Sequence, residues 1–142
     1  MRQFTLKPEK LSKAEQKRSD DREYAAVQER SGGVCEGCGE RNATDMHHRK
    51  YRGRGGLTMR DNLIHLCGGE GGLKGGNHSG CHGRAHTAIG EQLGWSVLTN
   101  NDPAIIPVFH KKTGLWTQND EPINAWDAME TMTLFGQVKG GA

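Results

Sequence analysis

The pattern of apolar and polar positions predicts one helix near the start of the chain. Tyr24 and Val27 form an apolar stripe within a polar stretch, which predicts a helix over about residues 20–31. Ser19 is a suitable N-cap for this helix, and the glycine pair that begins at Gly32 would end it. The narrow stripe indicates that only one face of the helix is buried.

Short strands are predicted in two later regions. His47 and His48 would end a first strand, and the apolar run at 62–66 predicts a second strand after a basic turn. Further along, the turn residues at 111–114 predict a β-hairpin between two apolar segments. We therefore expect an α+β fold, with an N-terminal helix and a C-terminal β-hairpin extension.

These elements divide the chain into one main domain with flanking segments. Composition and patterning place nearly all candidate chemistry in the first half of the chain. The predicted parts are a flexible polar tail or frayed helix at 1–18, the main domain at 19–90, a strand and hairpin extension at 91–122, and a weakly ordered tail at 123–142.

The composition indicates that the fold needs support beyond a hydrophobic core. Only 33% of the 142 residues are apolar, 21 are glycine, and the mean hydropathy is −0.78. Small domains with thin cores are commonly stabilised by a bound metal. The N-terminus has no apolar segment typical of a signal peptide, and no apolar run approaches membrane-spanning length. We therefore expect a soluble cytoplasmic protein with reduced cysteines.

The four cysteines predict a structural zinc site. Cys35 and Cys38 are separated by two residues, a spacing that brings two thiolates to one tetrahedral ion. Cys67 and Cys81 would complete the site, with a glycine-rich insertion at 68–80 between them. Two disulfides or four free thiols are the alternatives. His65 or His78 could replace a cysteine as a ligand, although an outward-facing strand residue and a loop residue are the simpler interpretations of these two.

The histidines form a second group. His82 and His86 are four residues apart, so on a helix both would lie on one face and could share an ion. His47 and His48 are adjacent, and neighbouring side chains of a regular strand point to opposite faces. The strand would have to be irregular to bring both rings to one substrate. For His110 we expect an ordinary, hydrogen-bonded polar role.

A basic run follows the histidine pair. Five cations and no acidic residue lie between Arg49 and Arg60, although the formal net charge of the chain is only +2. A local concentration of this kind favours an anionic partner. The competing interpretation is a solvated basic loop.

Nine polar positions together resemble a known family. They are Cys35, Cys38, His47, His48, Asn62, Cys67, Cys81, His82 and His86. In order and spacing they resemble the HNH endonucleases, which are ββα-metal nucleases, and in particular the small zinc-stapled HNH proteins of tailed bacteriophages. The resemblance covers about residues 20–90. The chain departs from the family at the insertion of 68–80, because family members usually have no gap there.

The resemblance implies a role for each of these residues. His48 would be the general base that activates a water molecule, and Asn62 would hydrogen-bond the turn that carries it. Asp45 would support the site or serve as an ordinary turn residue. A divalent catalytic cation (Mg²⁺, Mn²⁺, Ni²⁺ or Zn²⁺) would be held by His47, His82 and His86. The structural zinc would be held by Cys35, Cys38, Cys67 and Cys81. The DNA phosphates would be contacted by Arg49, Lys50, Arg52 and Arg54.

The implied function is metal-dependent hydrolysis of DNA phosphodiester bonds, with nicking as one form of it. A phage origin would add the large terminase subunit and the portal as partners, a role in genome packaging, and the host cytoplasm as location. A homing or restriction-like endonuclease is the alternative within the class. Outside it, a non-catalytic zinc-stapled nucleic-acid-binding module or an assembly protein would show similar cysteines.

Overall fold

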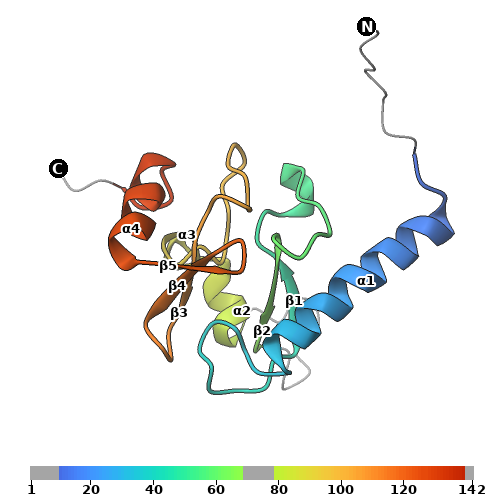
Figure 1. The fold of residues 1–142 in the computed structure, drawn as a ribbon, viewed down its shortest axis with the longest axis horizontal. Coiled ribbons are helices and arrows are strands. Elements are labelled where there is room, and N and C mark those ends of the chain that lie inside the picture. Colours follow the sequence, from blue (N-terminus) through green and yellow to red (C-terminus); the bar gives the residue numbers. More distant parts are fainter. Residues whose placement is uncertain (1–9, 69–78, 140–142) are drawn as a thin grey trace, which may run out of the picture.

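The computed structural model describes residues 10–68 and 79–139, and this part of the chain forms a small mixed α/β fold with four α-helices and two antiparallel sheets (Figure 1). The order along the chain is α1 (Lys13–Ser31), β1 (Asp45–His48), the 3-10 helix η1 (Arg52–Arg54), β2 (Leu63–Leu66), α2 (Gly80–Ala85), α3 (Ala88–Gln92), β3 (Val108–His110), β4 (Leu115–Gln118), β5 (Glu121–Ile123) and α4 (Ala125–Leu134).

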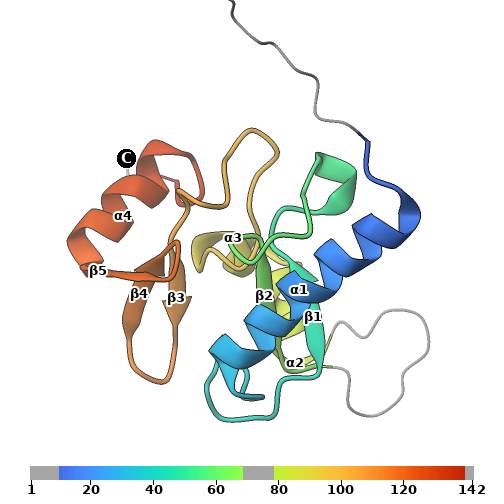
Figure 2. The same cartoon turned by 45° about the vertical axis from the view of Figure 1, so that its right-hand side comes forward.

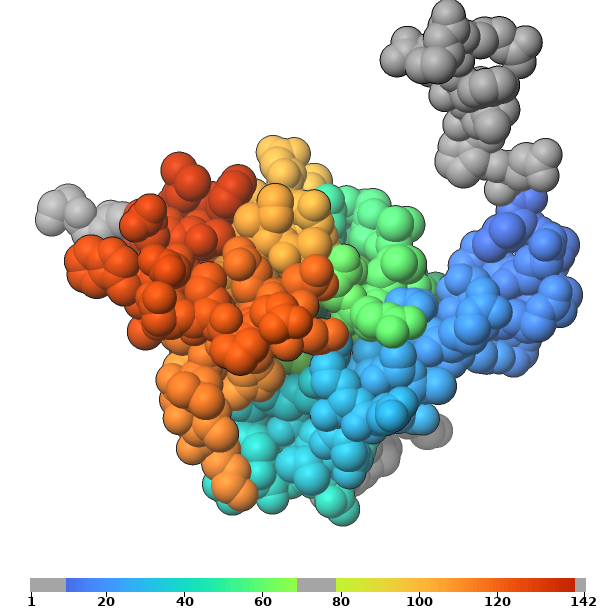
Figure 3. All heavy atoms as spheres, in the orientation of Figure 1, coloured from blue at the N-terminus to red at the C-terminus, as the bar shows by residue number. Residues whose placement is uncertain are grey.

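The elements fall into two groups that lie side by side. The β1–β2 pair is contacted through β2 by both α1 and α2. The three-stranded sheet β3–β4–β5 packs with α4 at the opposite side of the molecule from α1, as Figures 1 and 2 both show. On the face drawn in Figure 3, the C-terminal residues lie directly against the first group. Among the described residues, no helix is long and apolar enough to cross a membrane.

Helix α1 is longer than the sequence pattern predicts. It begins at Lys13, and its N-cap is Ser12, whose side chain accepts a hydrogen bond from the Glu15 amide while Glu15 bonds the Ser12 amide in return. The proposed cap Ser19 lies inside the helix, so for 13–18 the flexible tail is the wrong alternative and the helix is the right one. The error has a physical cause, because residues 13–18 are all exposed and, apart from Ala14, polar, so they show no apolar stripe. Gly32 ends the helix in the left-handed conformation, as expected.

Strand β2 is buried on both faces. It pairs with β1 in regular antiparallel register, with His47 opposite Ile64 and His48 opposite Leu63. All four of its residues are buried because α1 covers one side and α2 the other. His65 is therefore inside the protein, where its Nδ1 lies 2.8 Å from Ser31 Oγ, and the expectation that it faces outward is wrong.

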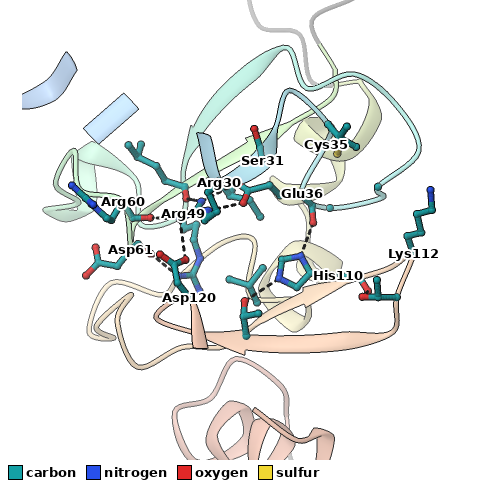
Figure 4. Close-up of a pocket in the computed structure, with 18 of the residues that line it drawn as sticks. Arg30, Ser31, Cys35, Glu36, Arg49, Arg60, Asp61, His110, Lys112 and Asp120 are labelled. Atoms are coloured by element: carbon teal, nitrogen blue, oxygen red, sulfur yellow. Dashed lines mark hydrogen bonds and ion pairs between the residues drawn. The ribbon is translucent and has the colours of Figure 1, made fainter. Parts of the chain in front are cut away.

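Arg30 connects three parts of the chain (Figure 4). Its guanidinium forms an ion pair with Glu36 at 2.6 Å and another with Asp120 at 3.2 Å, and it donates to the Leu63 carbonyl at 2.7 Å. Glu36 in turn accepts the amide of His65. This network joins the end of α1, the turn after Cys35, strand β2 and the β4–β5 turn.

The C-terminal residues have a hydrophobic cluster of their own. The predicted hairpin at 111–114 is present as β3 and β4. A third strand, β5, follows the Asn119–Asp120 turn, where both residues have positive φ. Helix α4 occupies part of the segment predicted as a weakly ordered tail, so that prediction is wrong for 125–134. The cluster consists of Val97, Ile106, Trp116, Ala128 and Met132.

Candidate metal centres

The four cysteine sulfurs are close enough to coordinate a structural metal such as zinc. All four lie within 4.8 Å of one another, and none is in a disulfide. A tetrahedral zinc with Zn–S bonds of about 2.3 Å needs sulfur atoms about 3.8 Å apart. The separation of 4.0 Å between Cys38 Sγ and Cys67 Sγ is near this value. Three of the four side chains are buried, so the site is closed on most sides.

Backbone amides donate hydrogen bonds to two of the sulfur atoms. The Cys38 amide donates to Cys35 Sγ at 3.4 Å, and the Cys81 amide donates to Cys67 Sγ at the same distance. A hydrogen bond from the Cys81 thiol lowers the pKa of Cys35 to about 4 and raises the pKa of Cys81. The cluster therefore favours a thiolate, which is the form that binds zinc.

The ends of the glycine-rich insertion meet next to the cysteines. Ser79 Oγ donates to the Gly68 carbonyl at 2.6 Å, and the His82 amide donates to the Cys67 carbonyl at 2.9 Å. Gly68 has φ of +149°, and a Cβ there would lie 2.3 Å from the Ser79 carbonyl oxygen, so only glycine fits. Residues 69–78, with most of the insertion and His78, lie outside the described part. In spite of the insertion, Cys81 lies beside Cys67. His82 follows Cys81 directly and belongs to the second cluster, which consists of histidines.

Three histidines form a second cluster. The nearest ring nitrogens of His47, His82 and His86 all lie within 4.8 Å of one another. His82 Nε2 and His86 Nε2 are 3.3 Å apart. Two imidazole ligands of a tetrahedral ion with metal–nitrogen bonds of about 2.05 Å would be separated by about the same distance. The helix α2 and its C-cap provide two of the rings, and β1 provides the third.

His47 is the buried member of this cluster. Its side chain is 3% exposed, and its Nε2 has no hydrogen-bond partner among the described residues. Burial, followed by the neighbouring charges of His82 and His86, lowers the pKa of His47 to about 3. The ring is therefore neutral at physiological pH, with an unpaired nitrogen facing two other imidazoles. Buried polar atoms without partners are rare, and a metal ligand is one explanation for them.

Asp45 supports the histidine cluster through a contact with the His82 ring. Its Oδ2 lies 2.6 Å from His82 Nδ1, so the carboxylate holds the ring with Nε2 toward His86. This carboxylate–histidine arrangement is common behind metal ligands. Asp45 lies two residues before His47 and hence on the same face of β1, a spacing that could have favoured this role over an ordinary turn residue.

His48 lies apart from the cluster. Its Nε2 is 3.0 Å from Thr58 Oγ1 and accepts from Arg52 Nε at 3.3 Å. Burial and then the charge of Arg52 lower the pKa of His48. Because β1 is regular through both histidines, the two rings point to different faces, and the expected irregularity is absent from this strand.

Asn62 fixes the turn that follows His48. Its side chain is 1% exposed, and it bonds both backbone groups of Lys50, accepting from the amide at 2.7 Å and donating to the carbonyl at 3.0 Å. It also donates to the Leu57 carbonyl at 2.9 Å. The amide thus ties together the two ends of the basic turn.

Arg49 does not face solvent, and the expectation that it contacts phosphate is wrong. The side chain is 3% exposed and points between the two groups of elements. Burial lowers the pKa of Arg49 to about 10, so it remains cationic at neutral pH. Its guanidinium donates to the backbone carbonyls of Gly94, Asp61, Pro103 and Ile106 at 2.6 to 3.0 Å. Arg49 therefore links β1 to the C-terminal residues.

The rest of the basic run surrounds an aromatic residue that sequence analysis missed. Tyr51 stacks on His86, with ring centroids 5.2 Å apart and planes at 24°. The guanidinium of Arg54 lies over the Tyr51 ring at 4.4 Å, while Arg52 is exposed. An aromatic residue between Lys50 and Arg52, shortly after the histidine pair, was a usable sequence signal.

A separate cavity of about 420 Å³ lies between α1, β2 and the β3–β4 hairpin (Figure 4). The histidine cluster does not line it. His110 lies at its edge with both ring nitrogens bonded, to the Glu36 carbonyl and to Thr117 Oγ1, which confirms the ordinary polar role expected for it. We therefore locate the candidate chemistry at the two metal clusters.

No protein-family model, curated protein or solved structure matches this chain.

Proposed function

We propose that this protein is a metal-dependent endonuclease of the HNH type that hydrolyses DNA phosphodiester bonds. The observation that supports this most directly is the unpaired, buried Nε2 of His47 beside His82 and His86. Four cysteines are enough ligands for a structural zinc, so the three imidazoles beside them are not needed for that site. The adjacent His48, Asn62 and basic turn have the residue types that phosphodiester hydrolysis requires.

The three imidazoles would hold one divalent cation. Nitrogen ligands suit Mn²⁺, Ni²⁺ and Zn²⁺ better than Mg²⁺, which prefers oxygen. When bound, the cation would act as a Lewis acid that stabilises charge on the phosphate and the leaving oxygen. Asp45 keeps the His82 ring in the tautomer whose Nε2 is available.

His48 would take the proton from the attacking water. Its lowered pKa keeps the imidazole neutral at physiological pH, as a general base requires. Because Arg52 Nε donates a hydrogen bond to His48 Nε2, this ring nitrogen carries no proton. It is therefore the basic nitrogen of His48, and it lies beside Thr58 Oγ1. Asn62 would preserve this arrangement by holding the turn at Lys50.

The phosphate backbone would be contacted by Lys50, Arg52 and Arg54. Arg52 is exposed, and Arg54 lies over the Tyr51 ring, whose other contacts include His86. A phosphate held by these side chains would lie beside the histidine cluster. Arg49 is excluded from this group because its donors are used inside the protein.

A second function is favoured by a different observation. The Nε2 of His48 contacts Thr58 and Arg52 and not the cluster. In a non-catalytic nucleic-acid-binding module, these contacts would be the whole role of His48, and both metal clusters would be structural. The two functions differ in whether DNA is cut.

Cleavage of supercoiled plasmid separates the two functions. Purified protein would be incubated with Mg²⁺, Mn²⁺ or Ni²⁺, beside His48→Ala, His82→Ala and the exposed control Arg18→Ala. We expect cutting by wild type and Arg18→Ala, and its loss in both histidine variants. Plasmid binding without cutting by any metal would support the binding module. If His48→Ala still cut the plasmid, His48 could not be the general base.

A further inference from the structure

His86 is the least protected of the three candidate ligands. It lies at the C-cap of α2, a helix of six residues, and is exposed, whereas His47 is buried and His82 is held by Asp45. An exposed imidazole at a helix end has several rotamers, and each ordered side chain loses conformational entropy when a ligand binds. The affinity of the cluster for a cation therefore depends on what holds this ring in place.

Tyr51 covers one face of the His86 ring. The two rings are nearly parallel, and the Tyr51 ring also meets the His47 ring edge-on at 5.9 Å. Tyr51 therefore touches one ligand from β1 and one from the end of α2. Contact through ring faces occupies no ring nitrogen, so it restricts His86 without competing for the metal.

Tyr51 is itself firmly positioned. Its hydroxyl accepts a hydrogen bond from Ser96 Oγ at 3.3 Å, and Ser96 is 1% exposed. The guanidinium of Arg54 lies over the ring, 4.4 Å from its centroid, and donates to the Val97 carbonyl at 3.2 Å. The Tyr51 carbonyl accepts the amides of Arg54 and Gly56 in the basic turn.

We propose that Tyr51 is a positioning residue of the histidine cluster, whose ring holds the His86 imidazole so that three nitrogens face one cation. This inference rests on the proposed function in one respect only, namely that the cluster binds a divalent cation. It makes the basic turn part of the metal site, because the residue that orders His86 lies between Lys50 and Arg52.

The test measures metal binding and does not require cleavage. Protein with zinc retained at the cysteines would be titrated with Ni²⁺ by calorimetry, for wild type, Tyr51→Phe, Tyr51→Leu and Tyr51→Met. We expect Tyr51→Phe to bind as wild type does, because the ring is kept. We expect both aliphatic variants to bind roughly 10-fold more weakly, as is typical when a residue that orients a ligand is lost. Two aliphatic variants are used in case one fails to fold.

A double-mutant comparison separates positioning from general packing. In a His86→Ala background, Tyr51→Leu should leave Ni²⁺ affinity unchanged, because the ring that it orders is gone. A further loss of affinity in that background would overturn the inference, as would equal affinity of Tyr51→Leu and wild type. Absence of Ni²⁺ binding by the wild-type histidines would overturn it too.

The result is distinct from that of the cleavage assay. Tyr51-dependent Ni²⁺ binding without plasmid cutting would support the inference and oppose the nuclease. Plasmid cutting with Ni²⁺ affinity that is independent of Tyr51 would do the reverse.

Discussion

Replacing Arg49 by methionine should destabilise the fold and leave DNA binding by the folded protein intact. Methionine keeps much of the apolar stem but removes every donor. Four backbone carbonyls then lose their partner, and the hydrogen bonds to Gly94 and Ile106 are the two that are buried from water. A buried acceptor without a partner costs about 1–3 kcal/mol, so these two contribute about 2–6 kcal/mol.

One term offsets this loss. Removing the guanidinium also removes the cost of burying its charge, a cost visible in the lowered pKa of Arg49. We therefore expect a net decrease of about 2–4 kcal/mol in the free energy of unfolding. Arg49→Lys should lie between wild type and Arg49→Met, because one ammonium cannot reach four carbonyls.

Urea unfolding of the zinc-loaded protein, followed by tryptophan fluorescence, measures the change. Trp95 and Trp116 are both buried. Trp95 reports on the core formed by β2 and the buried cysteines, and Trp116 reports on the C-terminal hydrophobic cluster. With a urea slope of about 2 kcal/mol per molar, the midpoint should fall by roughly 1–2 M. The matched control Arg52→Met, in the same basic run but exposed, should change stability by less than about 0.5 kcal/mol and weaken DNA binding. If Arg49→Met kept its stability and lost DNA affinity, the internal role of Arg49 would be refuted.

Four further predictions follow from the sites. Burial and the charge of Arg52 lower the pKa of His48, so DNA cleavage should persist below pH 6.5 and be lost at more acid pH. Arg52→Gln should move the acid limb of the pH–rate profile to higher pH. If the limb did not move, Arg52 would act on DNA alone. Asp45→Asn should weaken Ni²⁺ binding at the histidines roughly 10-fold in calorimetry, whereas unchanged affinity would contradict the support of His82 by Asp45. Cys38→Ser should lose stoichiometric zinc in elemental analysis and lower the melting temperature by roughly 10 °C or more; retained zinc would argue against the four-sulfur site. Deleting residues 71–76 should leave zinc content and melting temperature near the wild-type values, because the ends of the insertion already meet at Gly68 and Ser79. Loss of zinc in the deletion variant would show that the insertion shapes the cysteine site.

Local signals in the sequence predicted the parts of the fold that depend on neighbours in the chain. The glycine at 32 ended α1, the turn at 111–114 formed a hairpin, and the i, i+4 spacing placed His82 beside His86. The extent of α1 and the presence of α4 were missed because their polar or mixed turns have little periodicity. Only Ala128 and Met132 of α4 are buried.

The role of Arg49 could not be predicted from its neighbours. In the sequence it is the first cation of a basic run, and charge alone favoured an exposed position. Its partners Gly94, Pro103 and Ile106 lie 45 to 57 residues away, so its burial depends on how the C-terminal residues pack.

The Arg30–Glu36 pair has a consequence for solubility. The β1–β2 sheet has two strands, and the outer edge of β2 would normally offer free amides and carbonyls to another chain. Arg30 takes the Leu63 carbonyl, while the Glu36 carboxylate and amide take both backbone groups of His65. Glu36 lies in the turn between Cys35 and Cys38, so a metal bound by the cysteines would order this turn and keep the edge closed. Loss of zinc should therefore expose an open strand and promote aggregation.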